Sequence, residues 1–217
     1  MIHLDRVAKF YRIDGHRRTV LDDVTMSFEA GHSYGLLGVN GAGKSTTIRL
    51  ISGAELPNRG RILRTTRVSW PLGFANGLHH SMTGRENVHF VARVYGEDER
   101  AALEFVADFA EIGPYLDAPV RTYSTGMLAR LAFGLSMAIE FECYLIDETI
   151  SVGDERFRRR CAAAFTSRRR YADIIMASHD LPLIKEHCDR GVLLKDGKLI
   201  CFDRVDDANE AYKKANT

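Results

Sequence analysis

The chain has 217 residues, of which 45% are hydrophobic, 27% charged and 9% aromatic. This length suits one domain with a sizeable buried core, and the composition excludes long disorder, collagen and coiled coil. The 30 Lys and Arg residues nearly balance the 29 Asp and Glu residues, for a net charge of +1, whereas a bulk nucleic-acid binder needs a clustered excess of cations.

The first third of the chain is predicted to form strands and one helix. Alternating apolar residues predict strands over residues 2–7 and 20–28, and the polar residues 14–18 between them predict a turn. Residues 33–37 predict a short buried strand. A glycine-rich loop follows it, and residues 44–51 then predict a helix.

The middle of the chain is predicted to be helical. Thr83 and Glu86 have the spacing of a capping box, in which each residue satisfies a free amide at the start of a helix. The helical pattern extends over residues 83–112, with a second helix beginning at Glu99. A further helix is predicted over residues 124–139, where a serine stands at the N-cap position.

The last third of the chain predicts a parallel sheet. Residues 143–147 and 174–178 have the composition of buried strands, and residues 156–170 between them predict a helix. A strand, a helix and a strand of these lengths imply parallel strands with a right-handed crossover. Near the end, Asp196-Gly197 between two apolar runs predicts a β-hairpin, since both positions tolerate a positive φ.

The helix predicted over residues 156–170 contains seven arginines and no acid. One of its faces is apolar and carries Phe157, Cys161, Ala164 and Phe165. We interpret the arginines as a solvated face around this buried stripe. The alternative is contact with anionic lipid headgroups or with acidic groups of a partner. Nucleic-acid binding is disfavoured, because no aromatic residues stand among the exposed positions to stack on bases.

No segment of the sequence is apolar enough to cross a bilayer. The longest apolar-rich run, residues 131–139, is well short of the ~20 residues that a span requires, and the N-terminal residues lack the apolar stretch of a signal peptide. Attachment to a membrane through a partner stays open. The four cysteines have no CxxC spacing, so we expect free and mostly buried thiols in a reducing compartment.

The loop after the strand at residues 33–37 has the sequence of a phosphate-binding loop. It matches the pattern GxxxxGK[ST] without a mismatch, between a predicted strand and a predicted helix. Glycines let backbone N–H groups point at phosphate oxygens, Lys44 brings a charge to the β and γ phosphates, and the Ser45 hydroxyl can ligate Mg²⁺. A glycine-rich turn that binds nothing is disfavoured by this context. The predicted nucleotide contacts are Gly38, Asn40, Gly41, Ala42, Gly43, Lys44, Ser45 and Thr46.

Two acids and a histidine complete the predicted catalytic set. Asp147 and Glu148 follow the buried strand at residues 143–146, and acids at the carboxyl ends of parallel strands face the ligand crevice. Asp147 would hold Mg²⁺ through water, and Glu148 would orient or deprotonate the attacking water. His179 could donate a hydrogen bond to the γ-phosphate. Strand-end acids can also be mere caps, and a lone histidine is more often structural.

The segment Thr122 to Leu131 resembles the signature of ABC ATPases, which usually reads Leu-Ser-Gly-Gly-Gln. Ser124 and Gly126 match its key positions, while three neighbouring positions depart from the common form. A serine and a glycine at a helix start make a second anion site. The resemblance implies that this site acts in trans on the ATP held by another subunit, so that a homodimer of cassettes sandwiches two nucleotides.

The resemblance extends over nearly the whole chain. It implies that Tyr11 stacks on adenine, that Asp154 belongs to the D-loop and that His179 is the switch histidine. It further implies an α/β fold, the P-loop NTPase fold of an ABC nucleotide-binding domain, with an antiparallel β-subdomain. A helical subdomain over about residues 76–135 would be inserted in the single domain 1–217. The implied cofactors are ATP and Mg²⁺.

Several segments resemble the ATPase subunits of capsular polysaccharide exporters, namely residues 69–73, 81–88, 123–127 and 152–157. Related O-antigen and teichoic acid exporters share some of these motifs, and many carry a C-terminal extension. The end at Thr217 favours the capsular branch. The resemblance implies an integral membrane permease subunit, polysaccharide export machinery and a peripheral position on the cytoplasmic face of the bacterial inner membrane. The alternatives are an ABC ATPase of another transporter type, a soluble non-transport ABC ATPase and a module that binds nucleotide without hydrolysis.

The sequence contains no glutamine, although ABC cassettes place one between the phosphate loop and the signature to sense Mg²⁺. Aligned on Ser81-Met82-Thr83-Gly84, a glutamine common in the capsular subfamily falls at His79. An imidazole can ligate a metal or donate a hydrogen bond, so His79 is a candidate substitute. Asn76 and His80 are alternatives, as is an exposed loop histidine with no role in nucleotide binding.

Overall fold

The computed structural model describes residues 1–73, 77–147, 154–178 and 180–215. The chain forms two compact units, which we call the sheet unit and the helical unit. The sheet unit comprises Met1–Pro71, Phe141–Glu148 and Tyr171–Thr217, and the helical unit comprises Leu72–Glu140 and Thr149–Arg170.

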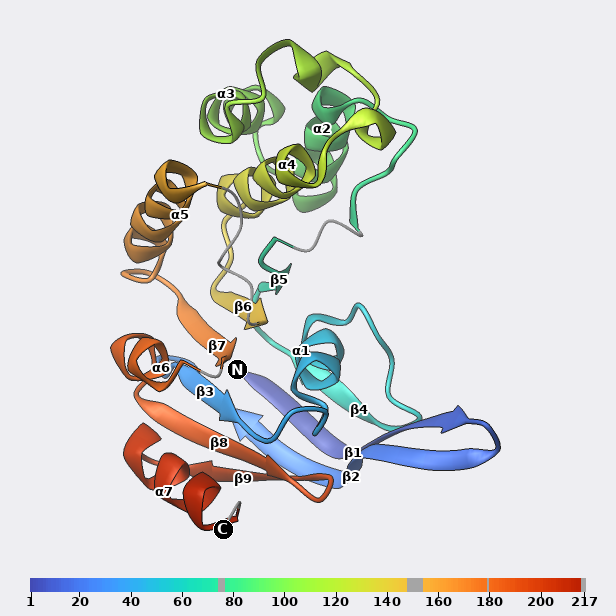
Figure 1. The fold of residues 1–217 in the computed structure, drawn as a ribbon, viewed down its shortest axis with the longest axis vertical. Coiled ribbons are helices and arrows are strands. Elements are labelled where there is room, and N and C mark those ends of the chain that lie inside the picture. The colour runs from blue at the N-terminus through green and yellow to red at the C-terminus, as the bar shows by residue number, and fades with distance from the viewer. Residues whose placement is uncertain (74–76, 148–153, 179, 216–217) are drawn as a thin grey trace. The chain divides into compact units, whose positions relative to one another are not determined.

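The first sheet of the sheet unit is antiparallel and has three strands in the order β2-β1-β4. These strands are β1 (Ile2–Ile13), β2 (His16–Phe28) and β4 (Arg59–Arg64) (Figure 1). The hairpin of β1 and β2 closes at Asp14 and Gly15, whose φ angles are 49° and 79°. Both strands are longer than predicted, because charged residues next to the turn continue the backbone pairing where apolar alternation has ended.

The second sheet has six strands in the order β5-β6-β7-β3-β8-β9. Its strands are β3 (Tyr34–Leu37), β5 (Val68–Pro71), β6 (Cys143–Asp147), β7 (Asp173–Ala177), β8 (Arg190–Lys195) and β9 (Lys198–Phe202). Strands β6 and β7 pair in parallel, as predicted. Strands β8 and β9 form the predicted hairpin, with positive φ at Asp196 and Gly197.

Three helices accompany these sheets: α1 (Lys44–Ser52), α6 (Leu181–His187) and α7 (Val205–Ala215). Helix α1 packs against β5, β6 and β7, whereas α7 packs against β3, β8 and β9. The buried residues Ile48, Leu50 and Ile51 of α1 join a core that strands of both sheets share. Because β3 runs directly into the loop before α1, the start of α1 lies at the carboxyl edge of the parallel strands.

The helical unit contains α2 (Gly84–Tyr95), α3 (Glu99–Ala110), α4 (Thr125–Ala138) and α5 (Glu155–Arg168). Two short 3₁₀ turns, Gly113–Asp117 and Val120–Thr122, lie between α3 and α4. Both hydrogen bonds of the capping box between Thr83 and Glu86 are present, as predicted. Ser124 caps α4 by accepting from the Met127 N–H at 3.2 Å.

The cysteines are all free thiols, and three of them, Cys143, Cys161 and Cys188, are buried. Burial raises the pKa of Cys143 and of Cys161 to about 12. These two thiols are therefore protonated and unreactive at neutral pH. Among the described residues, the longest apolar helices fall short of what a membrane crossing requires.

Three arginines of α5, Arg156, Arg158 and Arg159, are exposed, whereas Arg160 and Arg168 are half-buried. Several of these arginines pair with acids. The apolar stripe is buried at Phe157, Cys161 and Phe165, as predicted. Glu111, just past the end of α3, accepts from Arg156 at 2.7 Å and from Arg160 at 2.8 Å. It also lies 3.5 Å from Arg130 of α4. One carboxylate thus ties α3, α4 and α5 together.

Replacing Glu111 should destabilise the helical unit. We expect Glu111→Gln to cost about 1 kcal/mol, because three guanidinium groups would lose their shared counterion. The loss should shrink as salt is added, since salt screens the repulsion between the arginines. Glu104→Gln is the matched control, because Glu104 pairs with Arg100, one turn away on the same helix. Urea unfolding at two salt concentrations measures both, and equal stability of the two variants would contradict the network.

Candidate functional site

The phosphate loop joins β3 to α1 and depends on glycines at two kinds of position. Gly41 and Gly43 have φ angles of 76° and 113°, which are costly for any residue with a Cβ. A Cβ on Gly43 would also lie 2.2 Å from Val20 Cγ1, and a Cβ on Gly38 would lie 2.9 Å from the Leu194 carbonyl oxygen. The loop therefore passes closer to its neighbours than a side chain would allow.

The start of α1 has the electrostatics of an anion site. Lys44 is the first residue of α1 and is buried, and its ammonium donates to the Gly38 carbonyl at 2.8 Å and the Val39 carbonyl at 3.4 Å. The first turn of α1 holds no acid, and its N-cap residue is Gly43, which has no side chain to cap the amides. The partial positive charge of the helix end and the charge of Lys44 therefore act together on a bound phosphate.

The structure brings Ser45 and Asp147 together. The Ser45 hydroxyl, on the first turn of α1, donates to Asp147 Oδ1 at the end of β6, at 2.9 Å. A hydroxyl and a carboxylate are hard oxygen donors, which suit Mg²⁺. Among the described residues, no group of three or more His, Cys, Asp and Glu side chains forms a metal cage. A magnesium ion here would rely on these two oxygens together with water and phosphate, as Mg²⁺ sites usually do.

A cavity of about 460 Å³ opens over the phosphate loop. Its lining residues are Tyr11, Ile13, Arg18, Val20, Asn40, Gly41, Gly43, Lys44, Ser45 and Thr46. It thus collects most of the nucleotide contacts predicted from the sequence. Gly38 contributes its carbonyl to Lys44, and Ala42 faces a different cavity.

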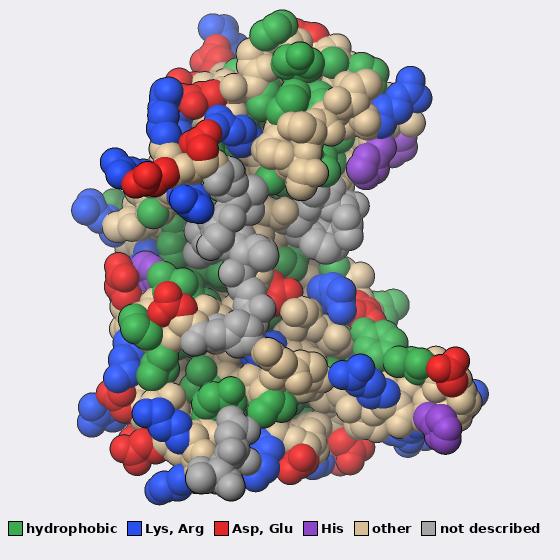
Figure 2. All heavy atoms as spheres, viewed as in Figure 1, with side chains coloured by type: hydrophobic (Ala, Val, Ile, Leu, Met, Phe, Trp, Pro, Cys, Tyr) green, Lys and Arg blue, Asp and Glu red, His purple; other side chains and the backbone are tan. Residues whose placement is uncertain are grey.

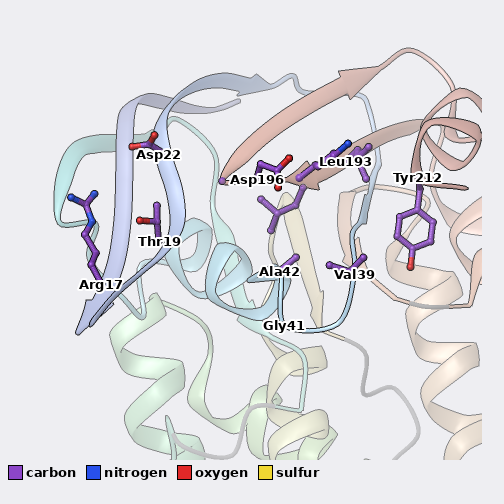
Figure 3. Close-up of a pocket in the computed structure, with 12 residues that line it drawn as sticks. Arg17, Thr19, Asp22, Val39, Gly41, Ala42, Leu193, Asp196 and Tyr212 are labelled. Atoms are coloured by element: carbon purple, nitrogen blue, oxygen red, sulfur yellow. The ribbon is translucent and has the colours of Figure 1, made fainter. Parts of the chain in front are cut away.

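That second cavity is larger, about 780 Å³, and it is lined by Val39, Gly41 and Ala42 of the loop. Figure 3 shows Arg17, Thr19 and Asp22 on one side of it and Tyr212 of α7 on the other. Neither Lys44 nor Ser45 lines it. The chemistry for binding phosphate therefore belongs to the smaller cavity.

The residues predicted for the signature and for the D-loop lie in the helical unit. Ser124 and Gly126 are exposed at the start of α4. Asp154 caps α5 by accepting from the Phe157 N–H at 2.9 Å, and Arg130 of α4 donates to it at 2.7 Å. The bond from Phe157 and the charge of Arg130 hold the pKa of Asp154 below its ordinary value, although partial desolvation opposes them. Asp154 is therefore an anion fixed between two helices.

The His79 imidazole is exposed, and its backbone is held by a buried side chain of α2. Asn87 is 1% exposed, accepts from the His79 N–H at 2.7 Å and donates to the His79 carbonyl at 3.1 Å. These bonds fix the loop while leaving the imidazole at the surface, and His80 beside it is exposed as well. The metal role of His79 stays a prediction.

Three predicted residues, Asn76, Glu148 and His179, lie outside the described residues. The structure also reveals residues near the loop that the sequence did not single out. Arg18 donates to the Gly41 carbonyl at 2.9 Å, and Glu55 accepts from the Tyr11 hydroxyl at 2.5 Å. Arg18 stands in the polar segment between the predicted strands, and nothing in the sequence distinguishes it from the other charged residues there. Glu55 belongs to no recognisable motif.

The sequence matches a family model and curated relatives over most of its length. Residues 21–151 match the model described as ABC transporter. The chain is 46% identical over 212 residues to the capsule polysaccharide export ATP-binding protein CtrD of Neisseria meningitidis serogroup B, covering 98% of each chain. It is 43% identical over 216 residues to the polysialic acid transport ATP-binding protein KpsT of Escherichia coli, covering 98% of this chain and 96% of that one.

The fold also matches solved structures. It is similar to the ATP-binding cassette MJ0796 in a dimeric post-hydrolysis state bound to ADP and Pi, with a TM-score of 0.75. This match covers 94% of this chain and 99% of the other at 18% identity. The likeness establishes the fold, and it confirms the α/β architecture that the sequence resemblance implied.

The close approach at Gly43 yields a test of the loop. We expect Gly43→Ala to weaken ATP binding at least ~10-fold, because left-handed strain of about 1–2 kcal/mol adds to a clash with Val20. Gly31→Ala is the control, since Gly31 has a φ of 82° but none of the described atoms lies within 4 Å of the place a Cβ would take. Titration calorimetry with ATP and chemical unfolding measure the two effects. Unchanged ATP affinity in Gly43→Ala would show that the loop does not hold the phosphates.

Proposed function

This chain belongs to the ABC transporter family, and we propose that it is the ATP-hydrolysing subunit of a transporter that exports a lipid-linked capsular or cell-surface polysaccharide. The observation that carries the nucleotide part of this proposal is the 2.9 Å contact between Ser45 and Asp147 beside the start of α1. It puts two oxygens suited to Mg²⁺ beside the first turn of α1, where Lys44 and Ser45 line the same cavity.

The chemistry of the site is positioning and electrostatics around a triphosphate. Lys44 and the backbone N–H groups of the loop would hold the β and γ phosphates, and Ser45 and Asp147 would hold Mg²⁺. Mg²⁺, when bound, supplies positive charge that offsets the charge of the phosphates. Glu148 would orient or deprotonate the attacking water, and His179 would donate to the γ-phosphate. Donors fixed in place before the reaction stabilise developing charge without reorganising.

The polysaccharide part of the proposal is supported by the relatives. CtrD and KpsT are named for the export of capsule polysaccharide and of polysialic acid, and each aligns over 98% of this chain. The same resemblance supports a peripheral position on the cytoplasmic face of the bacterial inner membrane, with the polymer carried by a separate permease.

A homodimer is the assembly we propose for hydrolysis. Ser124 and Gly126 are exposed at the N-terminus of α4, where backbone amides are available to an anion. A second copy of the chain could therefore present this pair to the ATP on the phosphate loop, with Asp154 beside it. In this arrangement each chain would use two anion sites, the phosphate loop for its own ATP and the N-terminus of α4 for the ATP of its partner.

The helical unit carries the surface that we propose for the permease. Hydrophobic side chains reach the surface of this unit in Figure 2. On α2, Phe90 is 56% exposed and Val94 is 63% exposed, one turn apart on the same face. Their opposite face carries the buried Val88 and Ala92. Helix α2 therefore offers apolar area on both sides, one for the core and one for a partner.

Replacement of Glu148 tests the hydrolytic step. We expect Glu148→Gln to reduce phosphate release about 10²–10⁴-fold, the usual contribution of a general base, while ATP affinity is retained. With Mg-ATP the variant should also form a dimer, measured by light scattering after gel filtration, alone or with its permease. Intact turnover in Glu148→Gln would assign the base to another residue.

Disruption of the gene in the source organism tests the transport role. Polysaccharide should then accumulate inside the cells and disappear from the surface, as seen by staining intact and permeabilised cells. A copy carrying Lys44→Ala should fail to restore surface polymer, whereas one carrying Lys195→Ala, a change at an exposed lysine, should restore it. Normal surface polysaccharide in the disrupted strain would favour another transporter type or a soluble ABC ATPase.

A further inference from the structure

A partly buried group of charged and polar side chains contacts the Tyr11 side chain. The Tyr11 hydroxyl donates to Glu55 Oε1 at 2.5 Å and lies 3.5 Å from Thr46 Oγ1. Lys9 Nζ is 2.8 Å from the same Glu55 oxygen. Arg49 Nε is 3.4 Å from Glu55 Oε2. The Glu55 carboxylate therefore accepts a hydrogen bond from a phenol and lies within salt-bridge distance of two cations.

The residues of this group come from three segments. Lys9 and Tyr11 are two apart on β1, so their side chains share one face of the strand. Thr46 and Arg49 belong to α1, and Arg49 Nη2 donates to Thr46 Oγ1 at 3.2 Å. Glu55 follows α1, and its backbone N–H donates to the Arg49 carbonyl at 3.2 Å. The group thus links the strand that carries Tyr11 to the helix that begins at Lys44.

Two of the three charges in this group are largely shielded from water, whereas the Arg49 side chain is 40% exposed. The side chains of Lys9 and Glu55 are only 10% and 22% exposed. Burial raises the pKa of Glu55, but the bonds from Lys9 and Tyr11 and the charges of Lys9 and Arg49 outweigh it and leave that pKa below its ordinary value. Glu55 is therefore a carboxylate at neutral pH and a strong acceptor for the phenol.

These contacts restrict the orientation of the Tyr11 ring. A tyrosine ring attached only at Cβ can rotate about two torsions, whereas a hydrogen bond at the far end of the ring fixes it. The Lys9 ammonium lies 5.1 Å from the ring centroid, within the range of a cation–π contact. Tyr11 also lines the cavity over the phosphate loop. The ring is consequently held in place at the site where a nucleotide base would lie.

We propose that Glu55 is a positioning residue, which holds the Tyr11 ring in the orientation for stacking on the adenine base and couples that ring to α1 through Thr46 and Arg49. This inference rests on the proposed function, since it takes the cavity to bind ATP. It assigns Glu55 no contact with the nucleotide. The ring meets the base, and Glu55 removes the entropic cost of fixing the ring at each binding event.

The two possible roles of Glu55, orienting the Tyr11 ring or stabilising α1, predict different changes in ligand affinity. If Glu55 orients only Tyr11, its replacement weakens the binding of ligands that carry a base and leaves the binding of bare phosphates unchanged. If Glu55 merely stabilises α1, both kinds of ligand bind more weakly. Inorganic tripolyphosphate has the phosphates of ATP without adenine and ribose, so it separates the two roles.

The test measures the affinities of the full-length chain for Mg-ATP and for Mg-tripolyphosphate by titration calorimetry. The variants are Tyr11→Phe, which keeps the ring and removes its hydroxyl, Glu55→Gln, which removes the charge, and Tyr11→Ala, which removes the ring. Asp5→Asn is the matched control, because Asp5 is a salt-bridged acid of β1 with a side chain 24% exposed, paired with Arg61 at 3.0 Å. Thermal unfolding establishes that each variant is folded.

We expect Tyr11→Phe and Glu55→Gln each to weaken ATP binding about 3–10-fold and Tyr11→Ala about 10–100-fold, in line with the worth of stacking on an aromatic ring. Tripolyphosphate should bind the three variants and the Asp5→Asn control as it binds the unmodified chain, and Asp5→Asn should bind ATP normally. The double variant Tyr11→Phe with Glu55→Gln should lose about as much affinity as Tyr11→Phe alone, because both changes act on the same contact: one removes the donor and the other weakens the acceptor by removing its charge.

The measurements distinguish a failure of the positioning role of Glu55 from a failure of the proposed function. If Tyr11→Ala weakens ATP binding while Tyr11→Phe and Glu55→Gln do not, the positioning role is wrong and the proposed function stands. Equal losses for ATP and tripolyphosphate in Glu55→Gln would make Glu55 a structural support of α1 and overturn the proposal. An unmodified chain that binds neither ligand would overturn the proposed function and this inference together.

Discussion

The contact between Ser45 and Asp147 is the constraint on which the candidate site depends. The two residues are 102 positions apart in the sequence, and their side chains lie 2.9 Å apart. They meet because β6, β7 and β3 are neighbouring parallel strands, so that their carboxyl ends share one edge, and because α1 starts at that edge. A one-residue shift in the β6 register would move Asp147 to the other face of the sheet and empty the site of its carboxylate.

The sequence predicted best those features that arise from neighbouring residues. The phosphate loop, the capping box at Thr83 and the Asp196-Gly197 turn each depend on a few consecutive positions, and the structure contains each local element. Strand β4 was missed, because its RGRILR segment lies mostly exposed on an edge and shows no apolar alternation. Glu55 was missed for another reason: its partners come from β1 and α1, and no pattern in the sequence brings them together.

The arginine-rich helix α5 shows how composition can mislead about charge. Residues 156–170 contain seven arginines and no acid, a composition typical of a solvated face or of contact with an anionic partner. Acids outside this segment nevertheless pair with several of the arginines, namely Asp108 of α3, Glu111 just past the end of α3 and Glu155 at the start of α5. Arg160 pairs with Asp108, and Glu111 is shared among three arginines. The interpretation of a solvated face around a buried stripe therefore holds for the stripe, but the arginines also serve as bridges between helices.

The cap at Ser124 is compatible with the second anion site proposed for α4. The Ser124 oxygen accepts from the Met127 N–H, which uses one lone pair and leaves the hydroxyl proton to be donated elsewhere. Gly126 adds no side chain over the first turn, so a phosphate could approach the helix amides directly. An aspartate or asparagine would cap the helix equally well, but an aspartate would repel phosphate by its charge. A serine at this position therefore satisfies two requirements that an aspartate would not meet together, namely capping the helix and accepting an anion beside it.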